Sequence, residues 1–376
     1  MINIEEPIDI GKPWLITKKN GTLLIDDTGN RLTAEYIYSK KGKERIDLLM
    51  WVFNYYRKKG FPYPDIDDLT LKQSYARLVR KNPNEVYVNN NIKNSGSLGL
   101  DICRYFTKEL YFNAKCGKKA KSCLDIFKND ELLIKVLKNR MGWNTTKEGG
   151  EERNYIFSID DKMIIQGMRS SGLSLNISQF RPIISKFLCG KYSKFRILDY
   201  SAGWGARALG AISLNMDYVG IDPLTSNNIN NLLNYYNSNS FVINGCSEDE
   251  HIYNNLGKFD FIFSSPPYFN QEIYSSDITQ NYNRYTNYKD WLKYYWKKTV
   301  INCINVLNSD GIFSLIMLDK VNKYEIAKDM INICYNNGLR IFKDIPIITC
   351  KSHLTNKVNT NKVKKNTEKI YLFRRK

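Results

Sequence analysis

The chain has 376 residues, of which 43% are hydrophobic and 13% aromatic, and its formal net charge is +18. The composition excludes a disordered chain, and the length favours a catalytic domain of roughly 200 residues together with a second module. The excess of Lys and Arg favours a polyanionic partner such as a nucleic acid, because each neutralised phosphate releases counterions, although a generally basic proteome would give the same surplus.

The first 160 residues predict a mostly helical module. Apolar side chains recur at helical spacing over residues 45–56 and 130–137, and Asn129 or Asp130 would cap the second helix. Prolines break the chain after the first helix, and the Asn- and Gly-rich residues 89–99 predict a loop. A basic cluster suits either a nucleic-acid backbone or a solvated helix end, and its members are Lys115, Lys118, Lys119 and Lys121. We expect residues 1–160 to contribute to target recognition.

Residues 161–376 predict an α/β domain with a Rossmann-like, doubly wound sheet of seven strands. The apolar segments that read as strands are residues 195–200, 217–222, 240–244, 259–264, 311–318, 339–345 and 369–374. No helical pattern separates the last two strands, so the last strand is expected to be antiparallel. Their connection, residues 351–367, is polar and rich in Lys, which suits either a solvated loop or phosphate contacts.

A glycine-containing turn follows the first of these strands. Asp199 and Ser201 lead into Gly203 and Gly205, and glycines there allow a backbone to approach a ligand closely. Asp222 ends the next strand, where a carboxylate accepts bonds from ribose hydroxyls or simply caps the following helix. By themselves these features fit NAD, FAD, nucleotide and S-adenosylmethionine sites alike.

The fourth strand ends in Ser265-Pro266-Pro267-Tyr268. The carboxyl ends of parallel strands face the ligand crevice, and the two prolines remove backbone donors while leaving carbonyl acceptors. An exocyclic amino nitrogen is a poor nucleophile because its lone pair is delocalised into the ring. If Ser265 Oγ and the Pro266 carbonyl accept its hydrogens, the lone pair becomes available for methyl transfer. Tyr268 would offer a flat face to a base that has left its stack, an interaction worth roughly 1–3 kcal/mol.

The next segment, residues 270–290, is crowded with aromatic side chains and one cation. Its members are Tyr274, Tyr282, Arg284, Tyr285 and Tyr288. This mixture suits an unstacked nucleic-acid strand, and it is equally compatible with an ordinary polar lid before a helix near Trp291.

Other kinds of site are disfavoured by the composition. The eight cysteines are scattered without a CxxC pair, which predicts reduced thiols and no zinc site. His251 and His353 are the only histidines, so Ser-His or Cys-His catalysis is not expected. The amino terminus lacks the features of a signal peptide and no apolar run is long enough to span a bilayer. We therefore expect a cytoplasmic or nuclear protein with no membrane partner.

Together these motifs resemble the amino-methyltransferase family that includes the DNA N6-adenine and N4-cytosine enzymes. The resemblance covers residues 176–374 and implies S-adenosylmethionine as cofactor. It implies that the target amino group binds at Ser265, Pro266, Pro267 and Tyr268, and that the cofactor binds at Phe180, Arg181, Asp199, Ser201, Gly203, Gly205, Asp222 and Ser247. Phe180 and Arg181 belong to the segment before the first strand, and Ser247 follows the third, where the adenine ring of the cofactor would lie.

The resemblance implies DNA as the substrate and leaves the target base open between adenine N6 and cytosine N4. Ser265 stands where adenine enzymes more often have Asp or Asn, which inclines the expectation toward cytosine. Two alternatives remain: an enzyme acting on an RNA base or a protein glutamine, and an inactive DNA-recognition partner with the same fold. The large positive charge disfavours the protein substrate.

Overall fold

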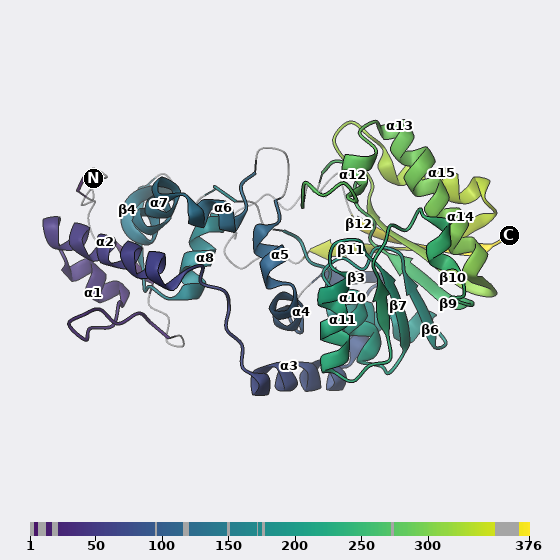
Figure 1. Ribbon diagram of the computed structural model, residues 1–376, viewed down its shortest axis with the longest axis horizontal. Coiled ribbons are helices and arrows are strands. Elements are labelled where there is room, and N and C mark those ends of the chain that lie inside the picture. Colours follow the sequence, from purple (N-terminus) through teal and green to yellow (C-terminus); the bar gives the residue numbers. More distant parts are fainter. Residues whose placement is uncertain are drawn as a thin grey trace. The chain divides into compact units, whose positions relative to one another are not determined.

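The computed structural model describes residues 4–6, 13–16, 22–94, 96–115, 120–148, 151–170, 172–174, 177–271, 274–349 and 368–376. The chain divides into two compact units: Met1–Asp65 with Phe112–Ile177, and Ile66–Tyr111 with Ser178–Lys376 (Figure 1). This division differs from the single boundary expected at residue 160, because Ile66–Tyr111 joins the second unit. Within the described residues, no helix combines the length and the apolar character needed to cross a membrane.

The first unit combines helices with a small sheet. Its helices are α1 (Ala34–Ser39), α2 (Gly42–Lys59), α6 (Cys123–Lys128), α7 (Asp130–Arg140) and α8 (Asp161–Ser170), and α5 (Lys108–Asn113) crosses the division between the units. Both predicted helices form, and Asn129 caps α7 by accepting a bond from the Leu132 N–H. The expectation of a mostly helical module missed a three-stranded sheet of order β1-β5-β4, formed by β1 (Trp14–Ile16), β4 (Met141–Glu148) and β5 (Glu151–Phe157).

The second unit is built on a nine-stranded sheet of order β2-β3-β11-β12-β10-β9-β6-β7-β8. The strands are β2 (Tyr87–Val88), β3 (Asn91–Asn94), β6 (Arg196–Asp199), β7 (Asp217–Ile221), β8 (Phe241–Ile243), β9 (Phe259–Ser264), β10 (Leu307–Leu318), β11 (Leu339–Thr349) and β12 (Glu368–Arg375). All seven predicted strands form. β12 runs antiparallel to both β10 and β11, which confirms the expected reversal of the last strand.

The two additional strands correct the prediction of a loop over residues 89–99. β3 pairs in parallel with the outer edge of β11, where Ile92 faces Ile347, and β2 pairs with β3 as a short hairpin. Asn89 and Asn90 take positive φ angles in the connection, which Asn tolerates better than most residues. Asn89 and Asn90, which suggested a loop, therefore form the tight turn of the β2–β3 hairpin. The residues that follow them form a strand because they pair with the edge of β11.

Helices cover both faces of the nine-stranded sheet (Figure 1). One face carries α3 (Asp68–Arg80), η1 (Pro83–Val86), α4 (Leu100–Phe106), α9 (Pro182–Tyr192), α10 (Ala206–Ile212) and α11 (Ser226–Tyr235). The other carries η2 (Glu250–Tyr253), α13 (Tyr288–Asp290), the π-helical η3 (Trp291–Trp296), α14 (Lys297–Val306) and α15 (Ile326–Asn336). A short helix, α12 (Asn281–Arg284), precedes α13.

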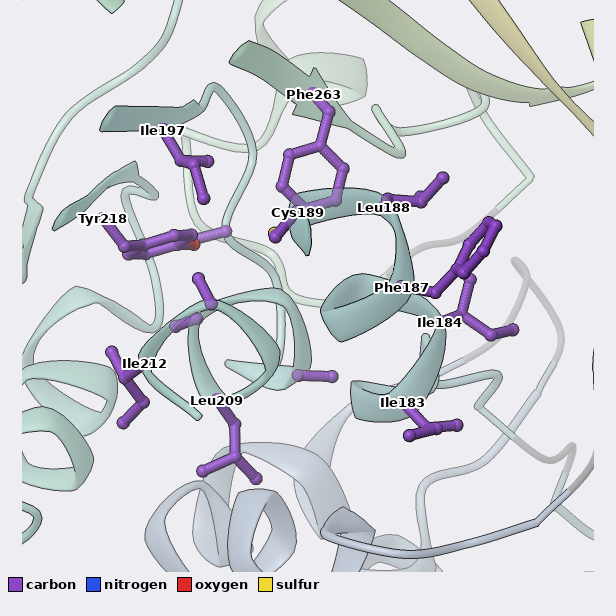
Figure 2. Packing of buried hydrophobic residues seen from close by; sticks show 14 of the residues in the cluster. Ile183, Ile184, Phe187, Leu188, Cys189, Ile197, Leu209, Ile212, Tyr218 and Phe263 are labelled. Carbon is purple, nitrogen blue, oxygen red and sulfur yellow. The ribbon is translucent and has the colours of Figure 1, made fainter. Parts of the chain in front are cut away.

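The core alternates between these faces as a parallel sheet requires. Ile197 and Phe263 point into the first cluster, where they meet α9 and α10 (Figure 2), whereas Leu198 and Ile262 point into the second. Every residue of β9 is buried, as expected for a central strand covered on both sides. The sheet thus fixes where β6, β7 and β9 end, and those ends carry the predicted motifs.

The segment Ile66–Tyr111 belongs to the second unit because its apolar residues complete the first of these clusters. Leu78 of α3 and Ile102 of α4 are fully buried there. Lys186 of α9 is also buried, and its ammonium donates to the carbonyls of Leu78, Val79 and Lys81 at 2.7–3.0 Å. These carbonyls lie at the end of α3, where helical carbonyls lack intrahelical partners and favour a cation. Burial lowers the pKa of Lys186, and the three carbonyls compensate for its lost hydration.

Candidate active site

The carboxyl end of β6 carries the predicted glycine turn. β6 ends at Asp199, and α10 begins after Gly205, which has a φ of +81°. Gly203 has a φ of +61°. Residues with a Cβ are strained in this left-handed region, so the path of the turn requires glycine at both positions. The turn brings the backbone to the edge of the sheet at which open α/β folds bind ligands.

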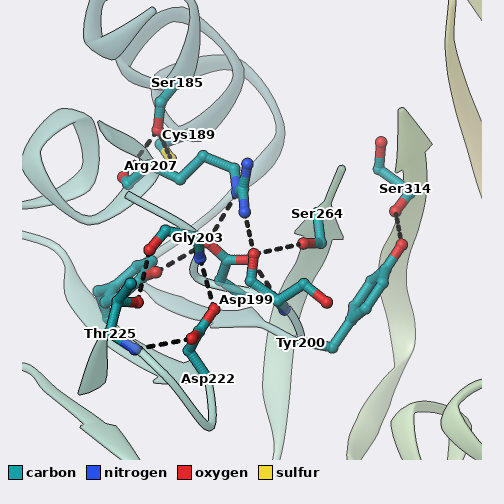
Figure 3. Close-up of polar contacts among 12 residues, drawn as sticks. Ser185, Cys189, Asp199, Tyr200, Gly203, Arg207, Asp222, Thr225, Ser264 and Ser314 are labelled. Carbon is teal, nitrogen blue, oxygen red and sulfur yellow. Dashed lines mark hydrogen bonds and ion pairs between the residues drawn. The ribbon is translucent and has the colours of Figure 1, made fainter. Parts of the chain in front are cut away.

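A buried ion pair supports this turn. Asp199 is fully buried, and its Oδ2 accepts bonds from Arg207 Nε at 2.8 Å and from Tyr218 Oη at 2.7 Å. Arg207 also donates to the Ser201 carbonyl (Figure 3). Burial disfavours the charged guanidinium, but the charge of Asp199, its hydrogen bond and the neighbouring tyrosines together outweigh burial and raise the pKa of Arg207. Asp199 therefore supports the turn through Arg207, and the direct cofactor contact that the resemblance implies stays a prediction.

Asp222, at the end of β7, ties the second strand to the glycine turn. Its carboxylate accepts the Gly203 N–H at 2.9 Å and the N–H groups of Leu224 and Thr225, each at 2.9 Å (Figure 3). Burial raises the pKa of Asp222, and these bonds oppose that rise. These bonds confirm that Asp222 caps the turn before α11, and its role toward a ribose stays a prediction. A carboxylate has about four acceptor positions, so three N–H bonds leave room for a hydroxyl.

The Ser-Pro-Pro-Tyr motif lies at the end of β9, beside the same turn. Ser264 Oγ donates to the Ser201 carbonyl at 3.2 Å, which joins the two strand ends directly (Figure 3). Ser265 and Pro267 are half-buried and Pro266 is buried. The structure therefore brings together the predicted glycine turn, the acidic strand end and the amino-group motif.

Tyr268 is held more tightly than its expected role as a stacking surface suggests. It is only 8% exposed, and its hydroxyl donates to Glu368 Oε1 at 2.8 Å and lies 3.4 Å from Ser265 Oγ. Its ring is therefore mostly covered in this conformation.

The residue after the motif is strained and firmly packed. Phe269 has a φ of +54°, which is unusual for a bulky residue and costs about 1–3 kcal/mol. Its ring is buried against Tyr288, Trp291 and Tyr324, with centroids 5.4–5.8 Å apart. This aromatic packing holds the backbone of the motif in place, and strain maintained by packing is frequent at functional sites.

The segment before α9 reaches the glycine turn from another side. The Phe180 ring lies 5.6 Å from the Arg207 guanidinium. Gln179 accepts a bond from Arg104 Nε at 2.7 Å, and Arg181 Nε donates to Asn94 Oδ1 at 3.3 Å. Pro182 occupies the first turn of α9, where its missing N–H costs no intrahelical bond. Residue 176, where the resemblance begins, lies outside the described residues.

No family model matches this sequence, and no curated protein does. Solved structures resemble it at low identity. TrmN from Thermus thermophilus is 11% identical over 57% of this chain and 67% of that one, with a TM-score of 0.37. An S-adenosylmethionine-dependent methyltransferase from Clostridium acetobutylicum is 14% identical over 51% and 89%, with a TM-score of 0.34. An O-methyltransferase of a Brevibacillus brevis multienzyme, solved with S-adenosyl-L-homocysteine, is 12% identical over 52% and 72%, with a TM-score of 0.35. Function is therefore inferred from the residues of this chain.

Glu368 is a site residue that the sequence motifs did not reveal. It begins β12 and pairs with Leu318, next to the motif at the end of β9. Burial raises its pKa, and the bond from Tyr268 and the charge of Arg207 oppose that rise. One signal was present: an antiparallel last strand starts at the edge where the parallel strands end, so its first polar residue must lie near the site.

Ser247 and residues 274–290 form hydrogen bonds, ion pairs and ring contacts with other parts of this chain. Ser247 is 4% exposed and its Oγ lies 3.0 Å from Thr299 Oγ1. Arg284 pairs with Glu248 at 2.9 Å and with Asp249 at 3.2 Å, so its charge is already balanced. Of the predicted aromatic residues, Tyr274 reaches the turn, where it meets Trp204 edge-on with centroids 5.4 Å apart. These contacts favour the lid reading of residues 274–290.

The predicted basic segments are only partly described. Lys115 pairs with Asp125 at 3.1 Å in the first unit, whereas Lys118, Lys119 and residues 351–367 lie outside the described residues. Their expected phosphate contacts stay predictions.

Proposed function

We propose that this chain is an S-adenosylmethionine-dependent methyltransferase that methylates the exocyclic amino group of a flipped-out DNA base, adenine N6 or cytosine N4. The observation that carries the proposal is the convergence of three motifs at one sheet edge. Asp222 is bonded to Gly203, and Ser264, next to the Ser-Pro-Pro-Tyr motif, is bonded to Ser201. These two bonds support the proposal, because they hold the turn assigned to the cofactor and the motif assigned to the amino group at one edge of the sheet.

The residues present fit this cofactor. Asp222 keeps acceptor capacity for a ribose hydroxyl, and the turn at Gly203 and Gly205 exposes its backbone to the crevice edge. We assign the methionine end to Ser201 and to Phe180 and Arg181, with Asp199 holding the turn through Arg207. Ser247, buried after β8, would lie near the adenine. Bound S-adenosylmethionine supplies an electrophilic methyl group.

The chemistry required of the protein is to prepare the amino nitrogen. Ser265 Oγ and the Pro266 carbonyl would accept its two hydrogens, which localises the lone pair on nitrogen. The nitrogen would gain the methyl group as the bond between that group and the cofactor's sulfur breaks, which leaves S-adenosylhomocysteine, and the nitrogen would release one proton to solvent. The Glu368 carboxylate accepts the bond from the Tyr268 hydroxyl and so positions that hydroxyl beside Ser265. It thereby adds negative potential near the nitrogen as positive charge develops there.

Nucleic acid as the substrate is supported by the net charge of +18, which favours a polyanion over a neutral small molecule. Target recognition is assigned to the first unit, because the catalytic edge is built wholly from residues of the second.

The direct test is incubation of the full chain with labelled S-adenosylmethionine and duplex DNA or RNA, followed by nucleoside mass spectrometry. We expect N6-methyl-2′-deoxyadenosine or N4-methyl-2′-deoxycytidine in the DNA digest. Methylation of RNA alone would replace DNA by the alternative substrate. A chain that does not bind S-adenosylmethionine by calorimetry would be the inactive partner, and the enzyme proposal would fail.

A variant at the motif tests the assigned chemistry. Tyr268→Ala should abolish methyl transfer and leave cofactor affinity nearly intact, because Tyr268 lies on the amino-group side of the crevice. Tyr335→Ala, at a 36% exposed tyrosine on α15, is the matched control and should retain activity. Full activity in Tyr268→Ala contradicts the assignment.

A further inference from the structure

Two arginines near the glycine turn lack an acidic partner. Arg104 lies on α4 and Arg181 immediately precedes α9. Their hydrogen-bond acceptors are the neutral amides of Gln179 and Asn94, at 2.7 and 3.3 Å. Among the described residues, neither guanidinium forms an ion pair with a carboxylate. Ion pairing elsewhere in this unit is ordinary, as Arg284 shows with Glu248.

The buried amide that binds Arg104 has an unused donor. Gln179 is 6% exposed, and its Nε2 is buried without a hydrogen-bond partner. Because Arg104 donates to Oε1, the orientation of the amide is fixed, and both hydrogens of Nε2 remain to be accepted. Buried donors are nearly always satisfied, so such a group indicates a missing acceptor.

The electrostatics of the cluster point to the same missing group. Burial lowers the pKa of Arg181, and the nearby positive charge of Arg104 lowers it further. Two like charges held close together in a half-buried setting favour an anion between them. Guanidinium groups match carboxylate and phosphate oxygens with paired N–H donors.

Two aromatic side chains connect the cluster to the glycine turn. The Arg104 guanidinium lies 5.6 Å from the centre of the Tyr111 ring, and Tyr111 packs edge-on against Trp204 with centroids 5.4 Å apart. Trp204 stands between the two glycines of the turn. A ligand bound at the glycine turn would therefore lie near the cluster.

We propose that Arg104, Gln179 and Arg181 form a binding site for an oxyanion, a carboxylate or a phosphate group. Two sources supply this chemistry at the crevice: the carboxylate of the cofactor's amino-acid portion and a phosphate of the nucleic-acid backbone. The first source rests on the proposed function. Arg104 comes from Ile66–Tyr111, so that segment contributes to ligand binding as well as to the core.

The test compares two ligands that differ in the carboxylate. S-adenosylhomocysteine carries it, and 5′-methylthioadenosine shares the adenosine thioether but lacks the amino-acid portion. Calorimetry with the full chain measures both, and DNA binding is measured as a function of salt. The variants are Arg104→Gln and Arg181→Gln, with Arg340→Gln as the matched control, since Arg340 bonds only to carbonyls near α15.

If the cofactor supplies the anion, each variant lowers the affinity for S-adenosylhomocysteine about 10- to 100-fold and leaves the affinity for 5′-methylthioadenosine unchanged. If DNA supplies it, S-adenosylhomocysteine is unaffected, and the salt dependence of DNA binding decreases by about one phosphate contact. Unchanged affinity for S-adenosylhomocysteine together with an unchanged salt dependence of DNA binding overturns the site. A wild-type chain that binds neither nucleoside refutes the proposed function, while the DNA arm still decides the anion site.

A second variant separates the site from a folding effect. Gln179→Glu places an anion between the two arginines, so the melting temperature should rise while the affinity for the external anion falls. A fall in melting temperature would show that the arginines do not create a surplus of positive charge at this position.

Discussion

The buried pair of Asp199 and Arg207 allows a quantitative test of how the glycine turn is held. Asp199→Asn keeps the shape of the side chain and removes its charge. Asp199 Oδ2 now accepts from Arg207 and Tyr218, and Oδ1 accepts the Ser201 N–H at 3.3 Å. In either orientation of the amide that this substitution introduces, its NH₂ group would face a group that now donates to Asp199: the Ser201 N–H in one orientation, and Arg207 and Tyr218 in the other. The substitution therefore leaves a buried guanidinium without a counter-charge and adds a donor conflict.

The expected cost follows from the burial of the pair. Their side chains are 0% and 6% exposed, and removing one partner of a buried ion pair typically costs about 3–5 kcal/mol. For a domain of 150–250 residues this corresponds to a fall in melting temperature of roughly 6–20 °C. Scanning calorimetry of the full chain measures it, and the loss should appear in the transition of the second unit. Affinity for S-adenosylhomocysteine should fall as well, because Arg207 binds the Ser201 carbonyl.

The control uses the same substitution at a solvated pair. Asp310→Asn breaks the pair of Lys194 and Asp310, whose side chains are 73% and 63% exposed, and should have no measurable effect on melting. If Asp199→Asn lowers the melting temperature no more than Asp310→Asn does, the buried pair does not stabilise the turn and the reasoning fails.

Two further substitutions probe the crevice. Burial raises the pKa of Glu368, so the folded chain favours its protonated form; this stabilisation is complete below the ordinary pKa of Glu and is lost as the pH rises through the raised value. Glu368→Gln should therefore leave the neutral-pH melting temperature unchanged or higher, while removing the acid limb of the wild-type pH–rate profile; identical profiles would contradict a role for the carboxylate. Asp222→Asn should lower the affinity for S-adenosylhomocysteine about 10- to 100-fold in calorimetry. A hydrogen bond to a charged acceptor is worth about 1.5–3 kcal/mol, and the NH₂ group of the new side chain would face an N–H donor. Undiminished affinity would rule out Asp222 as a cofactor ligand.

The sequence revealed the site residues that are neighbours in the chain, and it did not reveal those that meet only after folding. The glycine turn and the Ser-Pro-Pro-Tyr motif are each local, since their residue types impose a backbone path by themselves. Glu368 acquires its place only when β12 inserts between β10 and β11. Arg104 meets Gln179 across 75 positions of the chain, and no local pattern marks that contact.

The strands of Ile66–Tyr111 show how a partner overrides local preference. Residues 89–99 contain the Asn and Gly expected of a loop, yet Asn91–Asn94 form β3 because the edge of β11 offers unpaired backbone groups. Edge pairing satisfies these groups whatever the intrinsic strand preference of the added residues.

The sequence by itself determined the order and number of the main strands, the reversal of the last one, and the three motifs at the strand ends. These follow from hydrophobic periodicity, glycine and proline geometry, and the rule that parallel strands end at one edge. Tertiary structure alone decided that Ile66–Tyr111 belongs with the sheet, that Asp199 supports the turn through Arg207, that Glu368 bonds to Tyr268, and that Arg104 bonds to Gln179. Each of these depends on the burial and pairing of charges from distant segments, and such pairing is a property of the packed chain.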